Sequence, residues 1–284
     1  SLLRRIHKKK IAKKIFIYEK SKSNILKIKK LRLPCIVIDK LDKAAVNYDL
    51  IIFCTPMSEY KNLILKINNF ISSKTLITDI GSSKIETSKL IKKYLKKNIH
   101  WTQSHPIAGS EVSGPEHGKE NMFQDRWCIL IKEKNTKKNN LNILNNFWKK
   151  MGSKVIVMTT EKHDKIFSIT SHLPHLIAYN LVKSAQDFEK KQNYDLIKFS
   201  AGGLRDFSRI AASNEIMWRD IFFNNSNNIS KAIDLFIKNL TEFKKDINLK
   251  NNKSILKKLI QTKRVRSKIL KLKQDINKPD FGRG

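Results

Sequence analysis

Two hydrophobic periods alternate along the first half of the chain. Short apolar runs, of which 50–54 is the most continuous, predict strands buried on both faces of a sheet. Between these runs, apolar residues recur with the spacing of amphipathic helices. Strands that alternate with helices predict a parallel sheet built from βαβ units. The predicted strands are 14–19, 34–38, 50–54, 76–79, 127–131 and 155–158, and the predicted helices are 21–30, 56–70, 83–97 and 142–151.

Strand-like runs stop after Thr160, and only the helical period continues from there. The sequence therefore predicts a mostly parallel α/β domain over residues 1–159 and an all-helical domain over residues 160–284. The helical half carries more apolar faces than one sheet can cover, which favours a homodimer. Its predicted helices are 162–186, 216–223, 229–248 and 254–273, and the final PDFGRG predicts an irregular arm.

The net charge is the most unusual feature of the composition. The 284 residues carry a formal charge of +33, which raises nucleic acid as a partner. Most of the basic residues are lysines spread through nearly every segment, among many Asn and Ile, and all three residue types have A/T-rich codons. An A/T-rich genome therefore explains the many lysines. The scattered distribution of their charge favours small anionic ligands over nucleic acid as partners.

The remaining composition indicates a cytoplasmic protein. Cys35, Cys54 and Cys128 lie far apart without a CxxC motif, so we expect them to be reduced core residues. No run approaches the ~18 apolar residues of a membrane span. The first ten residues place their charge after their apolar part, the reverse of a signal peptide. We therefore expect no contact with a membrane.

Two motifs follow strand ends, where open α/β sheets bind their ligands. In the first, TDIGSSK at 78–84, Ser82 or Ser83 is either a helix N-cap or a hydroxyl that faces a ligand. In the second, SHPIAGSE at 104–111, His105 precedes a proline in a loop of small residues. A neutral imidazole with an unperturbed pKa of ~6.5 suits proton abstraction near neutral pH, so we expect His105 to be a general base.

The helical half holds two further candidate groups. His172 and His175 are three residues apart and share a helix face. A zinc pair is the alternative to a structural role, but neither an HExxH pattern nor a cysteine cluster supplies a third ligand, so no metal site is predicted. The segments SAGGLRDFSR at 200–209 and MWRD at 217–220 place arginines beside glycines. Such arginines suit bidentate carboxylate binding, and a helix cap with surface charge is the alternative.

These motifs together resemble one enzyme family. TDIGSSK, SHPIAGSEVSG, SHLPHLIAYNL and SAGGLRDFSRIAASNEIMWRDIF occur in the order that is typical of prephenate and arogenate dehydrogenases. The PDFGRG ending resembles the alphaproteobacterial cyclohexadienyl dehydrogenases within that family. The resemblance implies a Rossmann-like, NAD-binding α/β domain followed by a helical dimerisation domain. It also implies oxidative decarboxylation of prephenate to 4-hydroxyphenylpyruvate or of arogenate to tyrosine, which is a step of tyrosine biosynthesis.

The resemblance assigns roles to individual residues. His105 accepts the proton of the ring hydroxyl, and Ser82 hydrogen-bonds the same hydroxyl. Arg209 pairs with the side-chain carboxylate of the substrate with the help of His175. Glu111 is a candidate reader of the arogenate ammonium, and a turn cap or a lysine partner is the alternative for it. The other expected residues are Gly202, Arg205 and Trp218 around the substrate, and Glu19, Thr55, Pro56 and Ser82 around the cofactor.

The chain differs from the family in the segment that binds the diphosphate of the cofactor. Its first glycine is Gly81, so the glycine-rich turn and the strand before it are not found. The chain is therefore expected to begin inside the first helix, to lack the pyrophosphate cradle and to hold a cofactor poorly as it stands. The next strand ends at Glu19, which is either a ribose ligand that favours NAD over NADP or a solvated charge. The alternative functions are another NAD(P)-dependent dehydrogenase of the 6-phosphogluconate dehydrogenase-like architecture and a basic nucleic-acid-binding protein.

Overall fold

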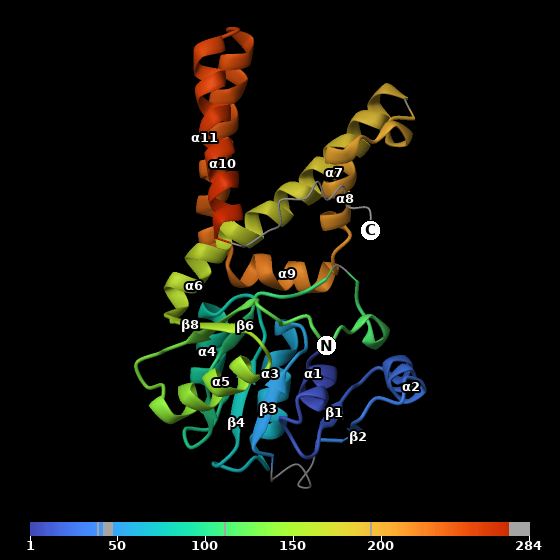
Figure 1. The fold of residues 1–284 in the computed structure, drawn as a ribbon, viewed down its shortest axis with the longest axis vertical. Helices are drawn as coiled ribbons and strands as arrows, with labels where there is room; N and C mark the ends of the chain where they lie inside the picture. Colours follow the sequence, from blue (N-terminus) through green and yellow to red (C-terminus); the bar gives the residue numbers. More distant parts are fainter. Residues whose placement is uncertain (39, 42–47, 111, 194, 273–284) are drawn as a thin grey trace. The chain divides into compact units, whose positions relative to one another are not determined.

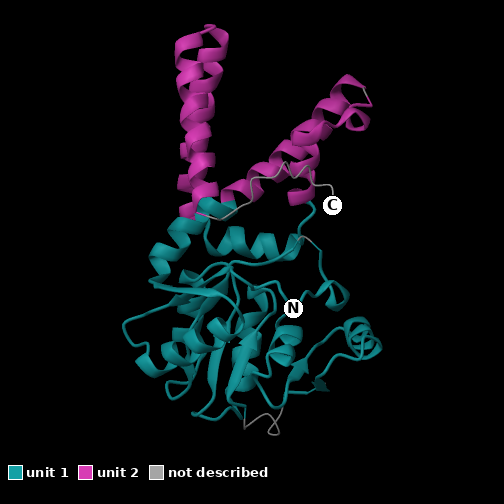
Figure 2. Ribbon diagram, viewed as in Figure 1, with its two compact units in different colours: residues 1–172, 212–226 teal, residues 173–211, 227–284 magenta. Residues whose placement is uncertain are grey.

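The computed structural model describes residues 1–38, 40–41, 48–110, 112–193 and 195–272, and these form two compact units. The first unit comprises residues 1–172 and 212–226, and the second comprises residues 173–211 and 227–284 (Figure 2). The chain thus leaves the first unit after His172, returns to it for one helix, and leaves it again after Ser226.

The first unit alternates strands with helices (Figure 1). Its strands are β1 (Phe16–Tyr18), β2 (Ile36–Ile38), β3 (Leu50–Phe53), β4 (Leu76–Asp79), β5 (His100–Trp101), β6 (Ser104–Pro106), β7 (Trp127–Ile131) and β8 (Lys154–Met158). Its α-helices are α1 (Leu2–Lys8), α2 (Lys22–Lys30), α3 (Tyr60–Ile67), α4 (Ile85–Tyr94), α5 (Lys138–Lys150), α6 (Thr160–Phe167) and α9 (Glu215–Asn224). Its short helical turns are η2 (Met57–Glu59), η3 (Pro115–His117) and η4 (Ser168–His172).

The strands form three short sheets with the orders β1-β2, β3-β4-β5 and β6-β7-β8. All pairs are parallel except β6 with β7. In β3 and β4 the register pairs Phe53 with Asp79, so both strands end at the same edge. The Rossmann-like, mostly parallel α/β architecture predicted from the sequence is confirmed.

His105 departs from the prediction, because it lies in β6 and not in a loop. Backbone pairing with β7 sets His105 opposite Ile129 and Ser104 opposite Leu130. The segment contains Pro106 and is only three residues long, so its hydrophobic pattern gives no strand signal. The consequence is functional, since a paired strand fixes the backbone of His105 more firmly than a loop does.

The main core of the first unit lies between the sheets and helices α1 and α5. Trp148, Leu144 and Met151 of the α5 region are fully buried, together with Cys128 and Leu130 of β7. Helix α5 presents Leu144, Phe147, Trp148 and Met151 to the sheet at helical spacing, and it packs on β7 and β8. Burial of such large side chains stabilises the unit by roughly 1.5–3 kcal/mol each.

The helix predicted over 162–186 is interrupted. Helix α6 ends at Phe167, one π-helical turn follows over Ser168–His172, and α7 begins at Leu173. Such π turns occur often at functional sites. This one divides the two histidines of SHLPH, because His172 belongs to the first unit and His175 to the second.

The second unit is helical throughout the part that the structure describes. Its elements are α7 (Leu173–Gln192), η5 (Ile197–Phe199), α8 (Gly202–Ala211), α10 (Ser226–Asn248) and α11 (Asn252–Lys271). Helices α7 and α8 pack on each other. Helices α10 and α11 are joined through Asp246, which accepts hydrogen bonds from Ser254 and, at 2.8 Å, from Lys258. The predicted PDFGRG arm lies outside the described residues.

The cysteines confirm the core prediction only in part. All three are free thiols. Cys128 is buried in the core, Cys35 is half-buried, and Cys54 is exposed at the end of β3, so the prediction was wrong for Cys54. The apolar run 50–54 continues past the last paired residue, Phe53, and this explains the error.

Candidate active site

A fully buried ion pair forms at the carboxyl end of β4. Lys84 Nζ lies 2.6 Å from Asp79 Oδ2, and both side chains have no exposed surface. The same ammonium donates to the backbone carbonyl of Ser104 at 2.7 Å. Asp79 also accepts from Trp101 Nε1 at 3.2 Å and from the Gly81 amide at 3.0 Å. The pair therefore ties the turn after β4 to β6, the strand that carries His105.

Gly81 is required by the close packing of this turn. A Cβ at this position would lie 3.0 Å from Asp79 Oδ2, 3.0 Å from Tyr60 Oη and 3.1 Å from Met57 Sδ. These three side chains are buried, so a Cβ would require them to shift by a few tenths of an ångström in a closely packed site. The glycine of TDIGSSK therefore serves the packing of the turn, and Ser82 follows it half-buried between β4 and α4.

The N-terminus of α4 is capped from another helix. Neither Ser82 nor Ser83 is the N-cap, which corrects that alternative of the sequence analysis; Lys84 holds the position and makes no side-chain cap bond. Instead the Asp164 carboxylate of α6 accepts from the backbone N–H of Lys84 at 2.8 Å and of Ile85 at 2.9 Å. A carboxylate at a helix N-terminus also interacts favourably with the helix dipole.

Asp164 begins a chain of hydrogen bonds that ends at His105. Its Oδ1 lies 2.7 Å from His163 Nδ1, and His163 Nε2 lies 2.8 Å from His105 Nδ1. His163 and Asp164 are fully buried, and His105 is 8% exposed. The Phe167 ring packs on both imidazoles, with centroid distances of 4.5 Å to His163 and 5.0 Å to His105.

This geometry determines which nitrogen of His105 can accept a proton. Backbone N–H groups can only donate, so the oxygens of Asp164 act as acceptors, and His163 Nδ1 must carry its proton toward Oδ1. His163 Nε2 is then an acceptor, and His105 Nδ1–H donates to it. His105 Nε2 is left with a lone pair, which is the form that a general base requires.

The surroundings keep both imidazoles neutral. Burial, the neighbouring His163 and the Lys84 ammonium hold the pKa of His105 well below its ordinary value of 6.5. Burial and Lys84 likewise lower the pKa of His163. Burial raises the pKa of Asp164, and the N–H groups of Ile85 and Lys84 oppose that rise. His105 is therefore an unprotonated base at neutral pH.

His172 and Trp218 lie in the same unit. The Trp218 ring stands edge-on to the His172 ring, with centroids 6.3 Å apart, and both side chains are buried. Asn225 Nδ2 lies 3.1 Å from His172 Nδ1 and donates to the Asp164 carbonyl at 2.8 Å. The π turn and α9 are thereby joined to the helix that carries His163.

Three of the predicted cofactor residues line one cavity. Glu19 follows β1, Thr55 and Pro56 follow β3, and the cavity between them measures about 400 Å³. A carboxylate at the end of a strand suits a ribose diol, so the residues present fit the adenosine end of a dinucleotide. A glycine-rich turn is not among residues 1–80, which contain no glycine. Ser82, the fourth predicted cofactor residue, does not line this cavity. The cavity is lined by Tyr18, Glu19, Lys20, Thr55, Pro56, Ser58, Glu59, Leu63, Ile216 and Arg219.

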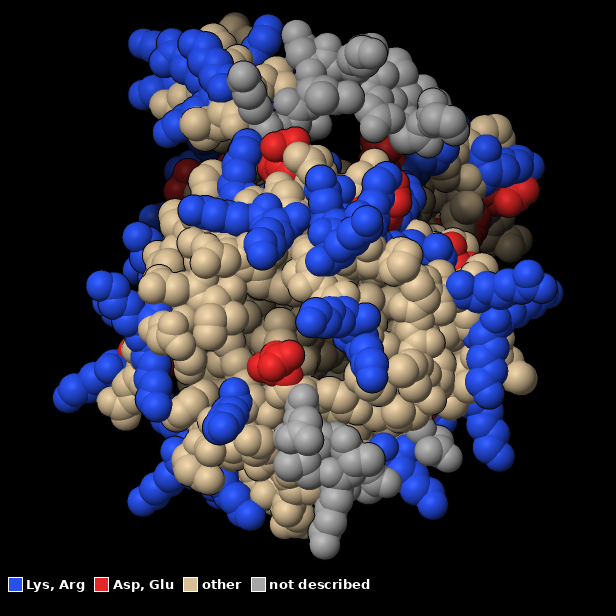
Figure 3. All heavy atoms as spheres, turned by 60° about the horizontal axis from the view of Figure 1, so that its bottom comes forward, with Lys and Arg blue, Asp and Glu red and all other residues tan. Residues whose placement is uncertain are grey.

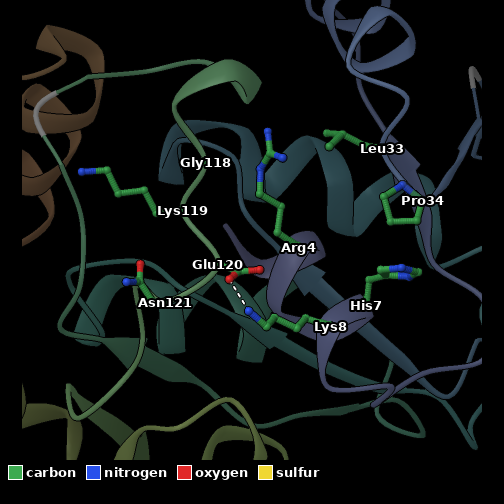
Figure 4. A pocket seen from close by; sticks show the side chains of 9 residues that line it. All are labelled: Arg4, His7, Lys8, Leu33, Pro34, Gly118, Lys119, Glu120 and Asn121. Carbon is green, nitrogen blue, oxygen red and sulfur yellow. Dashed lines mark hydrogen bonds and ion pairs between the residues drawn. The ribbon is translucent and has the colours of Figure 1, made fainter.

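A larger cavity, of about 730 Å³, lies between α1, the turn before β2 and residues 118–121. Figure 4 shows Arg4, His7 and Lys8 along α1, with Lys8 paired to Glu120. None of the predicted site residues lines it. The larger cavity therefore does not coincide with the residues that the sequence predicts for the site.

The basic side chains are dispersed on one face of the molecule. On the face shown in Figure 3, Lys and Arg side chains are scattered among uncharged ones and form no continuous stripe.

Among the described residues, no group of three or more His, Cys, Asp or Glu could hold a metal ion. In the same residues, no helix has the length and the apolar character to cross a bilayer.

The other predicted substrate residues belong to the second unit. Gly202, Arg205 and Arg209 lie on α8, with both arginines exposed, and His175 lies half-buried in the first turn of α7. The packing of α7 on α8 holds these two helices together. Glu111 lies outside the described residues.

Sequence reasoning missed His163, Asp164 and Lys84. His163 and Asp164 follow the strand 154–158, in the first turns of a helix that begins after Thr159. The available signal was a histidine next to an aspartate shortly after the end of a predicted strand. Lys84 was within the TDIGSSK motif, but its burial could not be read from a chain so rich in exposed lysine.

Comparison with known proteins agrees with this architecture. The family model described as prephenate dehydrogenase, nucleotide-binding domain, matches residues 2–157. The model described as prephenate dehydrogenase, dimerization domain, matches residues 159–262. Together the two matches span most of the chain.

Individual relatives carry related names. The chain is 30% identical to cyclohexadienyl dehydrogenase of Zymomonas mobilis over 261 residues, which cover 92% of this chain and 88% of that protein. It is 33% identical to prephenate dehydrogenase of Bacillus subtilis over 68% of this chain and about half (52%) of that protein. The crystal structure of prephenate dehydrogenase from Aquifex aeolicus in complex with hydroxyphenyl propionate and NAD+ matches with a TM-score of 0.87 and 30% identity, covering 94% of this chain and 93% of that one.

Proposed function

Because the chain belongs to the prephenate dehydrogenase family, we propose that it oxidatively decarboxylates prephenate, arogenate or both, with NAD+ as the oxidant, in tyrosine biosynthesis. The observation that supports the proposal is the hydrogen-bonded series Asp164–His163–His105, which holds the His105 imidazole by its Nδ1 and leaves Nε2 able to accept a proton. A hydroxyl whose carbon loses hydride needs such a base. The NAD+ complex of the Aquifex aeolicus relative supports the choice of oxidant.

The reaction needs a base and an oriented substrate. His105 Nε2 accepts the proton of the ring hydroxyl, the C–H bond of the same ring carbon breaks with loss of hydride, and the carbon–oxygen double bond forms. Loss of CO₂ from the opposite ring carbon then gives the aromatic ring. Bound NAD+ supplies the hydride acceptor. Aromatisation makes the second step favourable, so base catalysis and orientation are what the protein contributes.

Asp164 and His163 act as positioning residues in this proposal. Asp164 sets the tautomer of His163, and His163 in turn sets the tautomer of His105. Lys84 holds the strand of the base through the Ser104 carbonyl, and its charge adds to burial and to the neighbouring His163 in lowering the pKa of His105. Ser82 lies in the turn that Lys84 and Asp79 fix, and its hydroxyl is a candidate partner of the substrate hydroxyl.

The substrate carboxylates are bound by cationic side chains in this proposal. Arg209 of α8 pairs with the side-chain carboxylate, and His175 of α7, the helix that packs on α8, assists it. The family resemblance also assigns Gly202 and Arg205 of the second unit and Trp218 of the first unit to substrate binding. A dianionic substrate is attracted to a chain with a formal charge of +33.

Glu19 supports NAD over NADP. Its carboxylate lines the cavity at the end of β1 and accepts a hydrogen bond from the Ser21 amide at 2.9 Å, which fixes its position. A fixed carboxylate accepts hydrogen bonds from a ribose diol and repels a 2′-phosphate.

We propose in addition that the chain forms a homodimer through the helical unit. Helices α10 and α11 expose a large set of apolar side chains, which a monomer rarely leaves uncovered over such a length. The family match over 159–262 carries the description of a dimerisation domain. The exposed residues are Leu235, Ile237, Leu240, Ile247, Leu256, Leu259, Ile260 and Val265.

The function is tested by incubating the purified chain with each substrate and with each oxidised cofactor at high concentration, because a chain without the glycine-rich turn is expected to bind its cofactor weakly. We expect prephenate or arogenate, with NAD+, to give one NADH and one CO₂ per aromatic product, measured at 340 nm and by trapping of CO₂. We also expect NAD+ to have a higher kcat/KM than NADP+. Absence of aromatic product with both substrates contradicts the proposal.

A further inference from the structure

Arg219 of the MWRD segment lies at the cofactor cavity, although the proposed mechanism gives it no role. It lines the same 400 Å³ space as Glu19, Thr55 and Pro56, and it reaches this space from α9, far away in sequence. Its neighbour Trp218 is buried on the other side of the helix, toward His172. Two consecutive residues of α9 thus serve different parts of the same unit.

A buried carboxylate fixes the Arg219 guanidinium. Asp220 Oδ1 accepts from Arg219 Nε at 3.1 Å and from Nη2 at 2.7 Å. Asp220 is 5% exposed, and its Oδ2 accepts from the Ser58 amide at 2.8 Å. Burial alone would raise the pKa of Asp220. The hydrogen bonds from the Ser58 amide and from Arg219 outweigh burial and hold this pKa below its usual value. The guanidinium is therefore attached to the turn after β3 through an ionised group.

The fixed guanidinium still has donors for a ligand. A guanidinium has five N–H groups, and the two bonds to Asp220 leave three. Its side chain is 51% exposed, so these groups are open to the cavity and to solvent. The other cation of the cavity wall, Lys20, is paired with Glu59 at 2.6 Å. Of the two cations in this lining, Arg219 is held in place by its carboxylate partner and still has N–H groups that can donate to a ligand.

We propose that Arg219, oriented by Asp220, binds the diphosphate of the dinucleotide cofactor. The inference rests on the proposed function, because that function supplies the dinucleotide. Glu19 takes the adenosine ribose at one side of the cavity, and the diphosphate is the next anionic group along the cofactor. The planar fork of an arginine matches phosphate oxygens, and such charge-assisted bonds are about twice as strong as neutral ones.

The test measures binding of nucleotide fragments to the full chain, without turnover. Calorimetric titration with ADP, adenosine and adenosine 2′-monophosphate compares the wild type with Arg219→Ala, Arg219→Lys and Asp220→Asn. Arg126→Ala is the matched control, because Arg126 is an exposed arginine of the same unit that does not line either cavity. Thermal unfolding of each variant verifies that it is folded.

Arg219→Ala should weaken ADP binding by about tenfold or more and leave adenosine within twofold. Arg219→Lys should recover only part of the affinity, because lysine lacks the fork, and Asp220→Asn should weaken ADP while adenosine is unchanged. Arg126→Ala should change neither ligand. Equal losses for adenosine and ADP, a loss confined to adenosine 2′-monophosphate, or no ADP binding by the wild type would each overturn the proposal.

Failure of the two proposals can be distinguished. If prephenate or arogenate is oxidised with NAD+ but Arg219→Ala binds ADP normally, the assignment of Arg219 is wrong and the proposed function stands. If ADP binding depends on Arg219 but neither substrate is oxidised, the diphosphate site stands and the proposed reaction is wrong.

Discussion

Asp164→Asn should invert the proton positions of the whole histidine pair while barely changing its shape. Asp164 faces three donors, the amides of Lys84 and Ile85 and Nδ1–H of His163. An asparagine has one oxygen and one NH₂ group. Because backbone amides cannot change role and imidazoles can, the oxygen should stay with the amides and the NH₂ group should face His163.

The consequence at His105 follows from the two short distances. His163 Nδ1 becomes an acceptor, its Nε2–H then donates across 2.8 Å to His105 Nδ1, and His105 Nε2 carries the proton. The base is then in the wrong tautomer, so kcat should fall by about 10²–10⁴, the usual contribution of general base catalysis. This corresponds to roughly 3–5 kcal/mol of barrier.

The assay is steady-state NADH formation with saturating substrate and NAD+, together with thermal unfolding and ADP affinity. Glu161→Gln is the matched control, because Glu161 is exposed in the first turn of the same helix and loses the same charge. The control should keep normal kcat, and both variants should bind ADP normally. A kcat of Asp164→Asn within threefold of the wild type would refute the tautomer argument.

Four further predictions concern the same region and the helical unit. The acidic limb of kcat/KM should lie below pH 6.5, because burial, His163 and Lys84 lower the pKa of His105; a limb at or above 6.5 in a pH–rate profile would contradict this. His105 and His163 bind protons at a higher pH in the unfolded chain than in the folded chain, because burial lowers both pKa values in the fold. The free energy of unfolding should therefore decrease as the pH falls below 6.5. A Tm that stays constant between pH 7 and 5 would argue against buried neutral imidazoles. Lys84→Met leaves Asp79 buried without its cation and should cost about 3–5 kcal/mol in chemical denaturation, and a loss below 1 kcal/mol would show that the pair is not needed. Sedimentation equilibrium should give twice the 33.1 kDa chain mass, and a species at the chain mass itself across micromolar concentrations would count against the dimer.

The sequence predicted the elements with strong periodicity. β3 and β4 are apolar runs that end at motif residues, and both occur within one or two residues of the predicted bounds. Phe53 and Asp79 end at one edge because β3 and β4 pair in parallel, and this much was predictable from the strands. The strand β1 belongs to another sheet, so the approach of Glu19 to Thr55 and Pro56 was not.

Long-range polar contacts were not predictable in the same way. Asp164 caps α4 across 79 and 80 residues of sequence, and His163 meets His105 across 58. No local pattern encodes these distances, because they result from packing α6 against α4. The π turn after Phe167 was hidden for a similar reason, since its apolar spacing differs from that of a helix by one residue only.

The kcat of His105→Asn shows whether His105 is the base of a dehydrogenase that decarboxylates prephenate or arogenate. We expect the wild-type protein to reduce NAD+ with one of these substrates, measured at 340 nm. We expect His105→Asn to lower kcat by about 10²–10⁴ while its ADP affinity and Tm stay near those of the wild type. A His105→Asn variant that turns over at a near-normal kcat would contradict this role of His105.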